Sequence, residues 1–114
     1  MTGPTPKRGD IWTAAEKGAH TGKPRPVVII QSDRFDTIGS ITVCGFTTDA
    51  TEAPLFRIRV VPSPENGLKT ASAIMVDKIV ALRRESLDKR IGRLEDGELI
   101  HLNRSIAMFL GLAD

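Results

Sequence analysis

Hydrophobic and polar residues alternate along much of the chain with the two-residue period typical of β-strands. The clearest example is residues 55–61, in which apolar side chains alternate with Arg57 and Arg59. This pattern places the apolar residues on one face of a strand and the two arginines on the other. Similar alternation, or a short run of branched apolar residues, predicts strands at residues 9–14, 27–31, 41–46 and 72–82, and a short strand at residues 91–94.

Only the C-terminal part of the chain shows a helical period. Its mostly apolar face is formed by Leu99, Ile100, Asn103, Ile106, Ala107 and Leu110. Acidic residues at positions 95, 96 and 98 favour the positive end of a helix dipole, and Gly111 supplies a stop signal. The sequence therefore predicts a helix over residues 96–110, preceded by a short helical turn within residues 85–90.

These elements predict one small, mainly β domain of the α+β class. About five strands form a twisted antiparallel sheet, a barrel-like arrangement that the C-terminal helix closes. A chain of 114 residues is long enough to bury one core without disulfides. We assign residues 8–114 to this domain and residues 1–7, which have two prolines and no apolar anchor, to a flexible tail. Residues 16–23 are polar and contain two glycines, which predicts a mobile loop.

Composition limits the class of protein. The single cysteine, Cys44, excludes an internal disulfide framework and fits a reducing cytosol. No apolar run approaches the ~20 residues of a membrane span, and the polar first ten residues do not resemble a signal peptide. We therefore expect a cytoplasmic protein that does not contact a membrane. A net charge of +2 is too small for a general nucleic-acid coat, so any basic site must be local.

The strongest candidate for such a local site is Arg25, which lies between Pro24 and Pro26 and just before a buried strand. The two prolines leave the backbone of Arg25 little freedom. The planar guanidinium of arginine is well shaped to bind phosphate through two oxygens. The alternative from this stretch alone is an ordinary arginine in a surface turn.

Several short motifs, taken in order, resemble the MazF/PemK toxin family over about residues 7–113. The motifs are Arg8-Gly9-Asp10-Ile11-Trp12, the segment from Arg25 to Ile30, Thr47-Thr48, Asn66-Gly67-Leu68-Lys69, Val76-Asp77-Lys78-Ile79 and Leu110-Gly111-Leu112. The resemblance implies an SH3-like barrel, a homodimer and a bacterial, cytoplasmic toxin of a type II toxin–antitoxin system. It also implies an endoribonuclease that cuts single-stranded RNA at short sequences, stops translation and growth, and is blocked by a cognate antitoxin.

The resemblance assigns roles to individual residues. Arg25 matches the family's catalytic arginine, and Thr47 matches the catalytic hydroxyl that follows the third strand. Without the resemblance, Thr47 would be read as a strand-end threonine bonded to its own backbone. The remaining residues expected to bind substrate are Lys17, His20, Lys23, Thr48 and Asp77. His20 is either a general base, since histidine titrates near neutral pH, or an ordinary loop residue.

The sequence departs from the family pattern in two places. His20-Thr21 stands where many relatives carry Glu-Gln, and Met75 and Val80 stand where arginine is often found. We therefore expect a less cationic surface near Asp77, which bears on the cleavage sequence more than on the reaction.

The expected reaction needs no cofactor. RNA supplies its own nucleophile, the 2′-hydroxyl, and the protein stabilises the charge that develops on phosphorus. The two histidines are far apart in the sequence and there is one cysteine, so we expect no metal site. Two alternatives remain open: a barrel toxin that poisons DNA gyrase without catalysis, and an inactive module that binds RNA or a protein partner.

Overall fold

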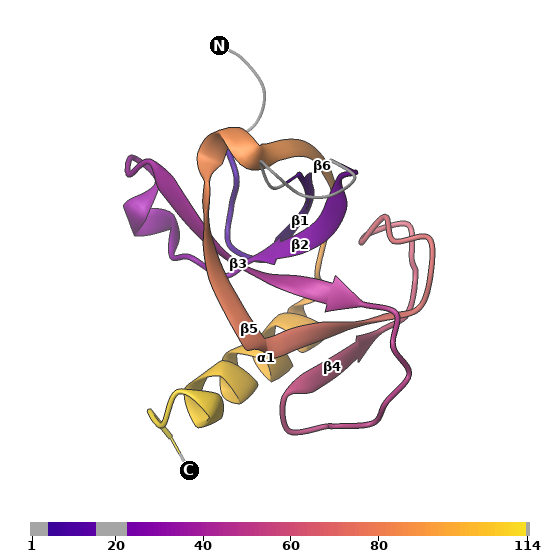
Figure 1. The fold of residues 1–114 in the computed structure, drawn as a ribbon. Coiled ribbons are helices and arrows are strands. Elements are labelled where there is room, and N and C mark those ends of the chain that lie inside the picture. The colour runs from indigo at the N-terminus through magenta and orange to yellow at the C-terminus, as the bar shows by residue number, and fades with distance from the viewer. Residues whose placement is uncertain (1–4, 16–22, 114) are drawn as a thin grey trace.

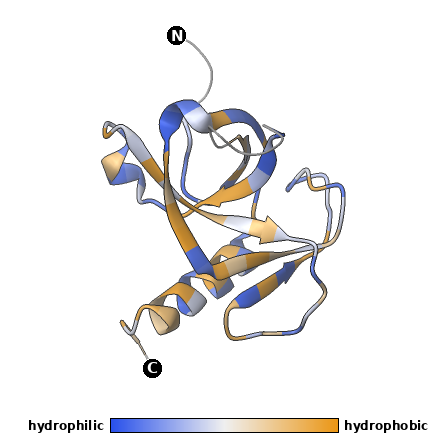
Figure 2. Ribbon diagram, in the orientation of Figure 1, coloured by the Kyte–Doolittle hydropathy of each residue, from blue (hydrophilic) through white to orange (hydrophobic). Residues whose placement is uncertain are grey.

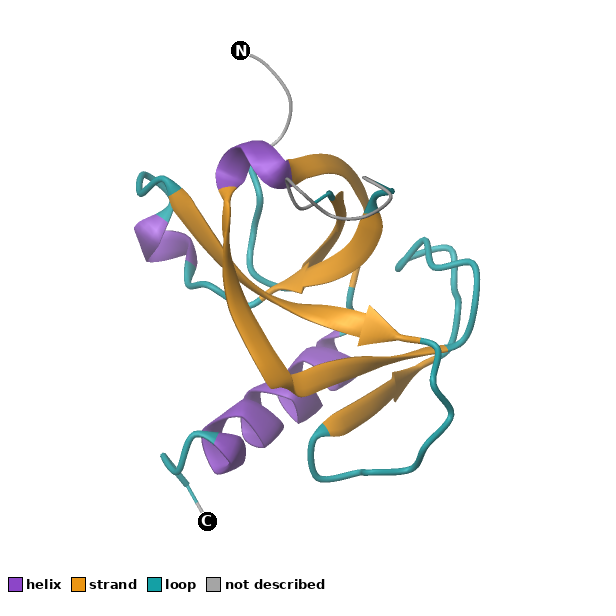
Figure 3. Cartoon of the chain, in the orientation of Figure 1, coloured by secondary structure: helices purple, strands orange, loops and turns teal. Residues whose placement is uncertain are grey.

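The computed structural model describes residues 5–15 and 23–113, which form a six-stranded antiparallel sheet and one long helix (Figures 1 and 3). The strands are β1 (Asp10–Ala14), β2 (Arg25–Ile29), β3 (Ser40–Thr47), β4 (Arg57–Val60), β5 (Ser72–Arg83) and β6 (Leu87–Arg93), in the spatial order β4-β5-β3-β2-β1-β6. The helix is α1 (Asp96–Phe109), and two short 3-10 helices are η1 (Asp33–Phe35) and η2 (Arg84–Ser86). The predicted class, a mainly β antiparallel fold with a C-terminal helix, is confirmed.

The sheet separates two hydrophobic clusters. One cluster lies between the sheet and α1 and contains Val28, Ile74 and Leu102, all of which have essentially no exposed surface. The other contains Trp12, Val27, Val43 and Leu82 and includes no residue of α1. Because side chains alternate along a strand, each long strand contributes to both clusters. We call the two sides the helix face and the open face of the sheet. Apolar residues colour much of β3 and β5 in Figure 2, as this double role requires.

The largest differences from the predicted strands are in β2 and β6. Strand β2 covers Arg25–Ile29 instead of residues 27–31, so Arg25 and Pro26 are part of the strand and pair with Ala14 and Thr13 of β1. Proline is tolerated at the beginning of a strand, so Arg25 lies within β2 and not just before it. The predicted helical turn at residues 85–90 is only η2, and β6 begins at Leu87. The polar side chains of this edge strand hid its period, and edge strands are often rich in charge.

The helix lies where it was predicted, but its buried face is only partly the predicted one, of which Leu99 and Ile106 pack against the core. Leu102 and Ser105 are buried and Leu99 is half-buried, whereas Ile100 and Leu110 are each 53% exposed. Asn103, predicted on the buried face, is also exposed and accepts a hydrogen bond from Arg8 Nη1. The helix has more apolar positions than one face can hold, so the period alone did not say which stripe packs on the sheet. No helix within the described residues has the length and apolar character needed to cross a membrane.

The Asn66-Gly67-Leu68-Lys69 motif forms a turn that packs closely on β6. Asn66 is fully buried; its side-chain oxygen accepts hydrogen bonds from the Ser63 and Leu68 amides, and its Nδ2 donates to the Val61 carbonyl. A Cβ atom at Gly92 would lie 2.3 Å from the Glu65 carbonyl oxygen. This contact fixes the loop between β4 and β5 against the sheet, next to the beginning of β5.

Candidate active site

Arg25 and Thr47 lie in one small pocket on the open face. The pocket has a volume of about 190 Å³ and is lined by Arg25, Pro26, Phe46, Thr47, Thr48 and Ser72. Arg25 is exposed and Thr47 is half-buried, so both side chains are accessible from solvent. The structure therefore brings together the two residues that the sequence predicted to be catalytic.

Strand register explains why the two residues meet. Val27 of β2 pairs with Gly45 of β3. Continuing this antiparallel register by two residues places Arg25 opposite Thr47, on the same side of the sheet as Val27. The side chain of Val27 belongs to the cluster that excludes α1, so the pair lies on the open face.

The Thr47 hydroxyl has one local hydrogen bond. Its Oγ1 accepts from the Asp49 amide at 3.1 Å. This is the backbone bond expected of an ordinary threonine at a strand end. It occupies a lone pair, however, and leaves the hydroxyl hydrogen available to donate to an anionic oxygen.

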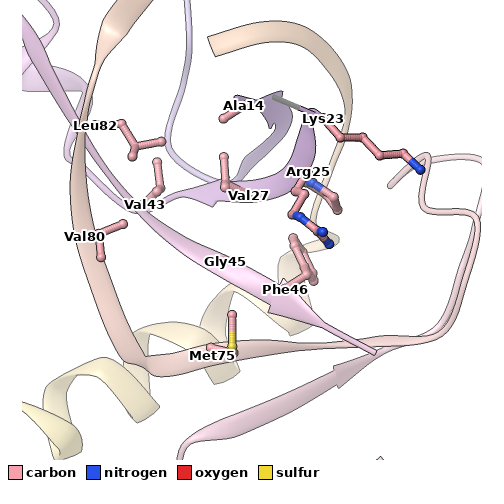
Figure 4. A pocket seen from close by; sticks show the side chains of 11 residues that line it. Ala14, Lys23, Arg25, Val27, Val43, Gly45, Phe46, Met75, Val80 and Leu82 are labelled. Atoms are coloured by element: carbon pink, nitrogen blue, oxygen red, sulfur yellow. The ribbon is translucent and has the colours of Figure 1, made fainter. Parts of the chain in front are cut away.

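Beside Arg25 the open face is hollowed. A depression of about 300 Å³ has Ala14, Val27, Val43 and Leu82 among its lining residues, with Lys23 and Arg25 on the same lining (Figure 4). Met75 and Val80 line it too, and Met75 Cε lies only 3.1 Å from the position that a Cβ at Gly45 would occupy. Met75 and Val80, the departures from the family pattern near Asp77, thus lie in the same depression and make its wall apolar.

A larger depression, of about 520 Å³, lies on the other side of Pro26. It is lined in part by Lys23, Thr48, Lys69 and Ser72. Lys23 and Thr48, two of the predicted substrate-binding residues, are therefore close to Arg25 and Thr47. Lys69 and Ser72 were not predicted. Ser72 is 5% exposed and donates a hydrogen bond to the Thr70 carbonyl at 2.8 Å, and no sequence pattern distinguishes it from other serines at the start of a strand.

Asp77 does not line any of these pockets. Its carboxylate accepts two hydrogen bonds from Arg57, at 3.0 Å from Nε and 3.2 Å from Nη2. These hydrogen bonds hold the pKa of Asp77 below its usual value and raise the pKa of Arg57. The remaining predicted residues, Lys17 and His20, lie outside the described residues.

Comparisons with known sequences identify the family of the chain. The sequence model of the PemK-like, MazF-like toxins of type II toxin–antitoxin systems matches residues 7–110. The chain is 53% identical over 107 residues to a probable endoribonuclease MazF of Mycolicibacterium smegmatis, a match that covers 94% of this chain and 98% of that protein. It is 26% identical over 110 residues to endoribonuclease MazF of Staphylococcus epidermidis, covering 93% of this chain and 92% of that one.

Solved structures show the same fold. A mycobacterial endoribonuclease in complex with its cognate antitoxin superimposes with a TM-score of 0.78 at 22% identity, over 96% of this chain and 98% of that one. A MazE–MazF complex from Deinococcus radiodurans gives a TM-score of 0.79 at 16% identity, over 97% of this chain and 100% of the matched chain. With the family model covering most of the sequence, the chain belongs to the PemK-like, MazF-like toxins of type II toxin–antitoxin systems.

Proposed function

We propose that Arg25 and Thr47 carry out the RNA cleavage of this MazF-type endoribonuclease toxin. The observation that carries the proposal is the single pocket that both side chains line on the open face. The curated relatives are named endoribonucleases, which favours a nuclease over a gyrase poison or an inactive module.

The reaction follows from what the two side chains can do. The RNA 2′-hydroxyl loses its proton to a base and attacks the adjacent phosphorus, and the bond to the 5′-oxygen breaks as that oxygen gains a proton. The Arg25 guanidinium binds the non-bridging oxygens and stabilises the extra negative charge. The Thr47 hydroxyl donates to a phosphate oxygen in the same step. The products are a 2′,3′-cyclic phosphate and a 5′-hydroxyl. No metal is needed to generate the nucleophile, because the nucleophile belongs to the substrate, and Arg25 supplies the positive charge.

The depressions on either side of Pro26 suit a single strand of RNA. Lys23 and Lys69 lie on their lining and supply positive charge for the backbone, while the apolar depression beside Arg25 can accept a base. With four phenylalanines, one tryptophan and no tyrosine, the chain can offer little base stacking. Cleavage at short sequences in the bacterial cytoplasm then stops translation and growth.

Two protein partners complete the proposal. A cognate antitoxin, as in the complexes formed by the structural relatives, covers Arg25 and Thr47 with an acidic segment that folds on binding. A second copy of the chain packs on the exposed apolar end of α1, where Phe109 is 49% and Leu112 is 77% exposed. Light scattering at micromolar concentration that gives only the monomer mass of 12.4 kDa would contradict the homodimer.

Cleavage of a modified RNA tests the proposed reaction. The cleavage site is first mapped by sequencing RNA 5′ ends, and a short RNA containing it is then made with a single 2′-deoxy nucleotide at that site. We expect cleavage of the unmodified RNA in EDTA, cyclic-phosphate products, and no cleavage of the 2′-deoxy RNA. Activity that disappears in EDTA and returns with magnesium, or cleavage of the 2′-deoxy RNA, would overturn the mechanism.

A further inference from the structure

The open face carries an additional arginine in line with the proposed catalytic pair. Arg59 of β4 pairs with Ala73 of β5, and Ala73 pairs in turn with Thr47 of β3. Directly paired residues of antiparallel strands have their side chains on the same face, so Arg59 and Thr47 flank Ala73 on the open face. With neighbouring strands about 4.8 Å apart, the Arg59 backbone lies about 10 Å from Thr47 and about 14 Å from Arg25.

The side chain of Arg59 is exposed and makes no polar interaction with the described part of the chain. Within residues 5–15 and 23–113, no salt bridge or side-chain hydrogen bond involves Arg59. Across β4, β5 and β3, the small side chain of Ala73 is the one that lies between the side chains of Arg59 and Thr47. A free guanidinium in this position can reach an anion that lies over the sheet beside the catalytic pocket.

Arg57 offers the contrasting case two residues earlier. Its side chain is on the same face but is only 17% exposed. It donates two hydrogen bonds to Asp77, and its guanidinium lies 5.6 Å from the centre of the Phe56 ring. The charge of Arg57 is therefore used within the fold. Arg57 and Arg59 line a small depression of about 140 Å³ together with Thr51, Glu52, Ala53 and Pro54. Glu52 brings a carboxylate to this depression but forms no ion pair with Arg59 among the described residues.

We propose that Arg59 is a phosphate anchor, which binds a backbone phosphate of the RNA next to the one cleaved at Arg25 and Thr47. This inference rests on the proposed function, because it requires RNA to lie on the open face. A backbone separation of about 10 to 14 Å from the catalytic pair lets the long Arg59 side chain contact a neighbouring phosphate on the same strand. Arginine binds phosphate through two parallel hydrogen bonds, which orients the strand as well as attracting it.

Binding measurements on uncleaved RNA test the anchor. The probe is the short mapped RNA with a 2′-deoxy nucleotide at the cleavage site, and its Kd is measured by fluorescence anisotropy at several salt concentrations. We expect Arg59→Gln to weaken binding on the order of 10-fold. The slope of log Kd against the logarithm of the salt concentration should decrease by about one, because one phosphate contact is lost. Single-turnover cleavage of the unmodified RNA, at protein concentrations below the Kd, should slow by about the same factor as the affinity falls.

The matched control is Arg34→Gln, which removes the same charge from η1. Arg34 is exposed and precedes β3, whereas Thr47 is at the other end of that eight-residue strand. We expect this variant to keep the wild-type affinity and salt dependence. Thermal melting of both variants should match the wild type, since neither side chain is buried.

Replacing single phosphates with uncharged methylphosphonates identifies the contact. With the wild-type protein, a methylphosphonate at one phosphate other than the cleaved one should weaken binding. The same methylphosphonate should not weaken binding further with Arg59→Gln. The proposed anchor is overturned if Arg59→Gln binds RNA with the same affinity as Arg34→Gln. It is also overturned if every methylphosphonate weakens RNA binding equally for the wild type and for Arg59→Gln, or if Arg59→Gln changes only the binding of the antitoxin. A wild-type protein that does not cleave RNA would instead overturn the proposed function.

Discussion

The two faces of the sheet differ in how completely they are covered. On the helix face, α1 packs on β4 and β5, and Leu102 reaches a cluster in which Val28, Ile74 and Leu94 have almost no exposed surface. On the open face, Leu82 and Val43 border a depression of about 300 Å³ instead of a covering element. One sheet therefore supplies a closed core on one side and an accessible site on the other. The proposed catalytic residues lie on strands whose opposite faces hold them in the core.

The largest effect expected from this comparison is on stability. Leu102→Ala should lower the free energy of unfolding by about 3–5 kcal/mol, because it leaves a closed cavity under α1. Leu82→Ala should lower it by about 2 kcal/mol, because Leu82 already borders open space. Denaturant unfolding of the two variants measures both values. Equal losses would show that the open face is as closely packed as the helix face.

A smaller and pH-dependent effect is expected for the Arg57–Asp77 pair. Its hydrogen bonds lower the pKa of Asp77 in the folded protein, so the pair stabilises the fold when the carboxylate is ionised and is lost as the pH falls through that pKa. Asp77→Asn should therefore cost about 1 kcal/mol at pH 7. The difference from the wild type should shrink below about pH 4.

The control for Asp77 is Asp88→Asn on β6, which removes an exposed carboxylate that has no ion pair among the described residues. Melting curves at pH 7 and pH 3 should show almost no change for this variant. RNA cleavage by Asp77→Asn should remain close to the wild-type rate. A severe loss of cleavage would return Asp77 to the substrate site.

Cysteine labelling gives the smallest signal and tests how tightly the helix face is closed. Burial raises the pKa of the Cys44 thiol to about 12, and its side chain is fully buried. We therefore expect almost no reaction with iodoacetamide at pH 8 in the folded protein and complete reaction in denaturant. Rapid labelling of the native protein would mean that the cluster beneath α1 opens readily.

Sequence patterns predicted the elements better than their contacts. The strand containing Arg57 and Arg59 was predicted because one face of β4 is buried and the other is not. The beginning of β2 was missed because two prolines resemble a turn. The buried face of α1 was predicted only in part, because the sheet decides which apolar residues it covers.

The site shows the same division. The family resemblance predicted catalytic roles for Arg25 and Thr47, and these roles stay predictions. The structure places both residues in one pocket and places Lys23 and Thr48 near them. The position of Arg59 could not be predicted, because it depends on the register of β5 with both of its neighbours. That register shifts at an irregularity between Cys44 and Phe46, and its size cannot be read from the sequence.

Single-turnover cleavage by Arg25→Lys and Thr47→Ala tests the central claim most directly. Lysine keeps the charge but loses the planar fork, and alanine removes one donor with little change in volume. Each variant should lose about 2.7–4 kcal/mol of transition-state stabilisation, or ~100-fold or more in rate, while RNA affinity and the melting temperature change much less. Rates near the wild type for both variants would remove the catalytic site from the open face, and a collapse confined to His20→Ala would move it to the segment before β2.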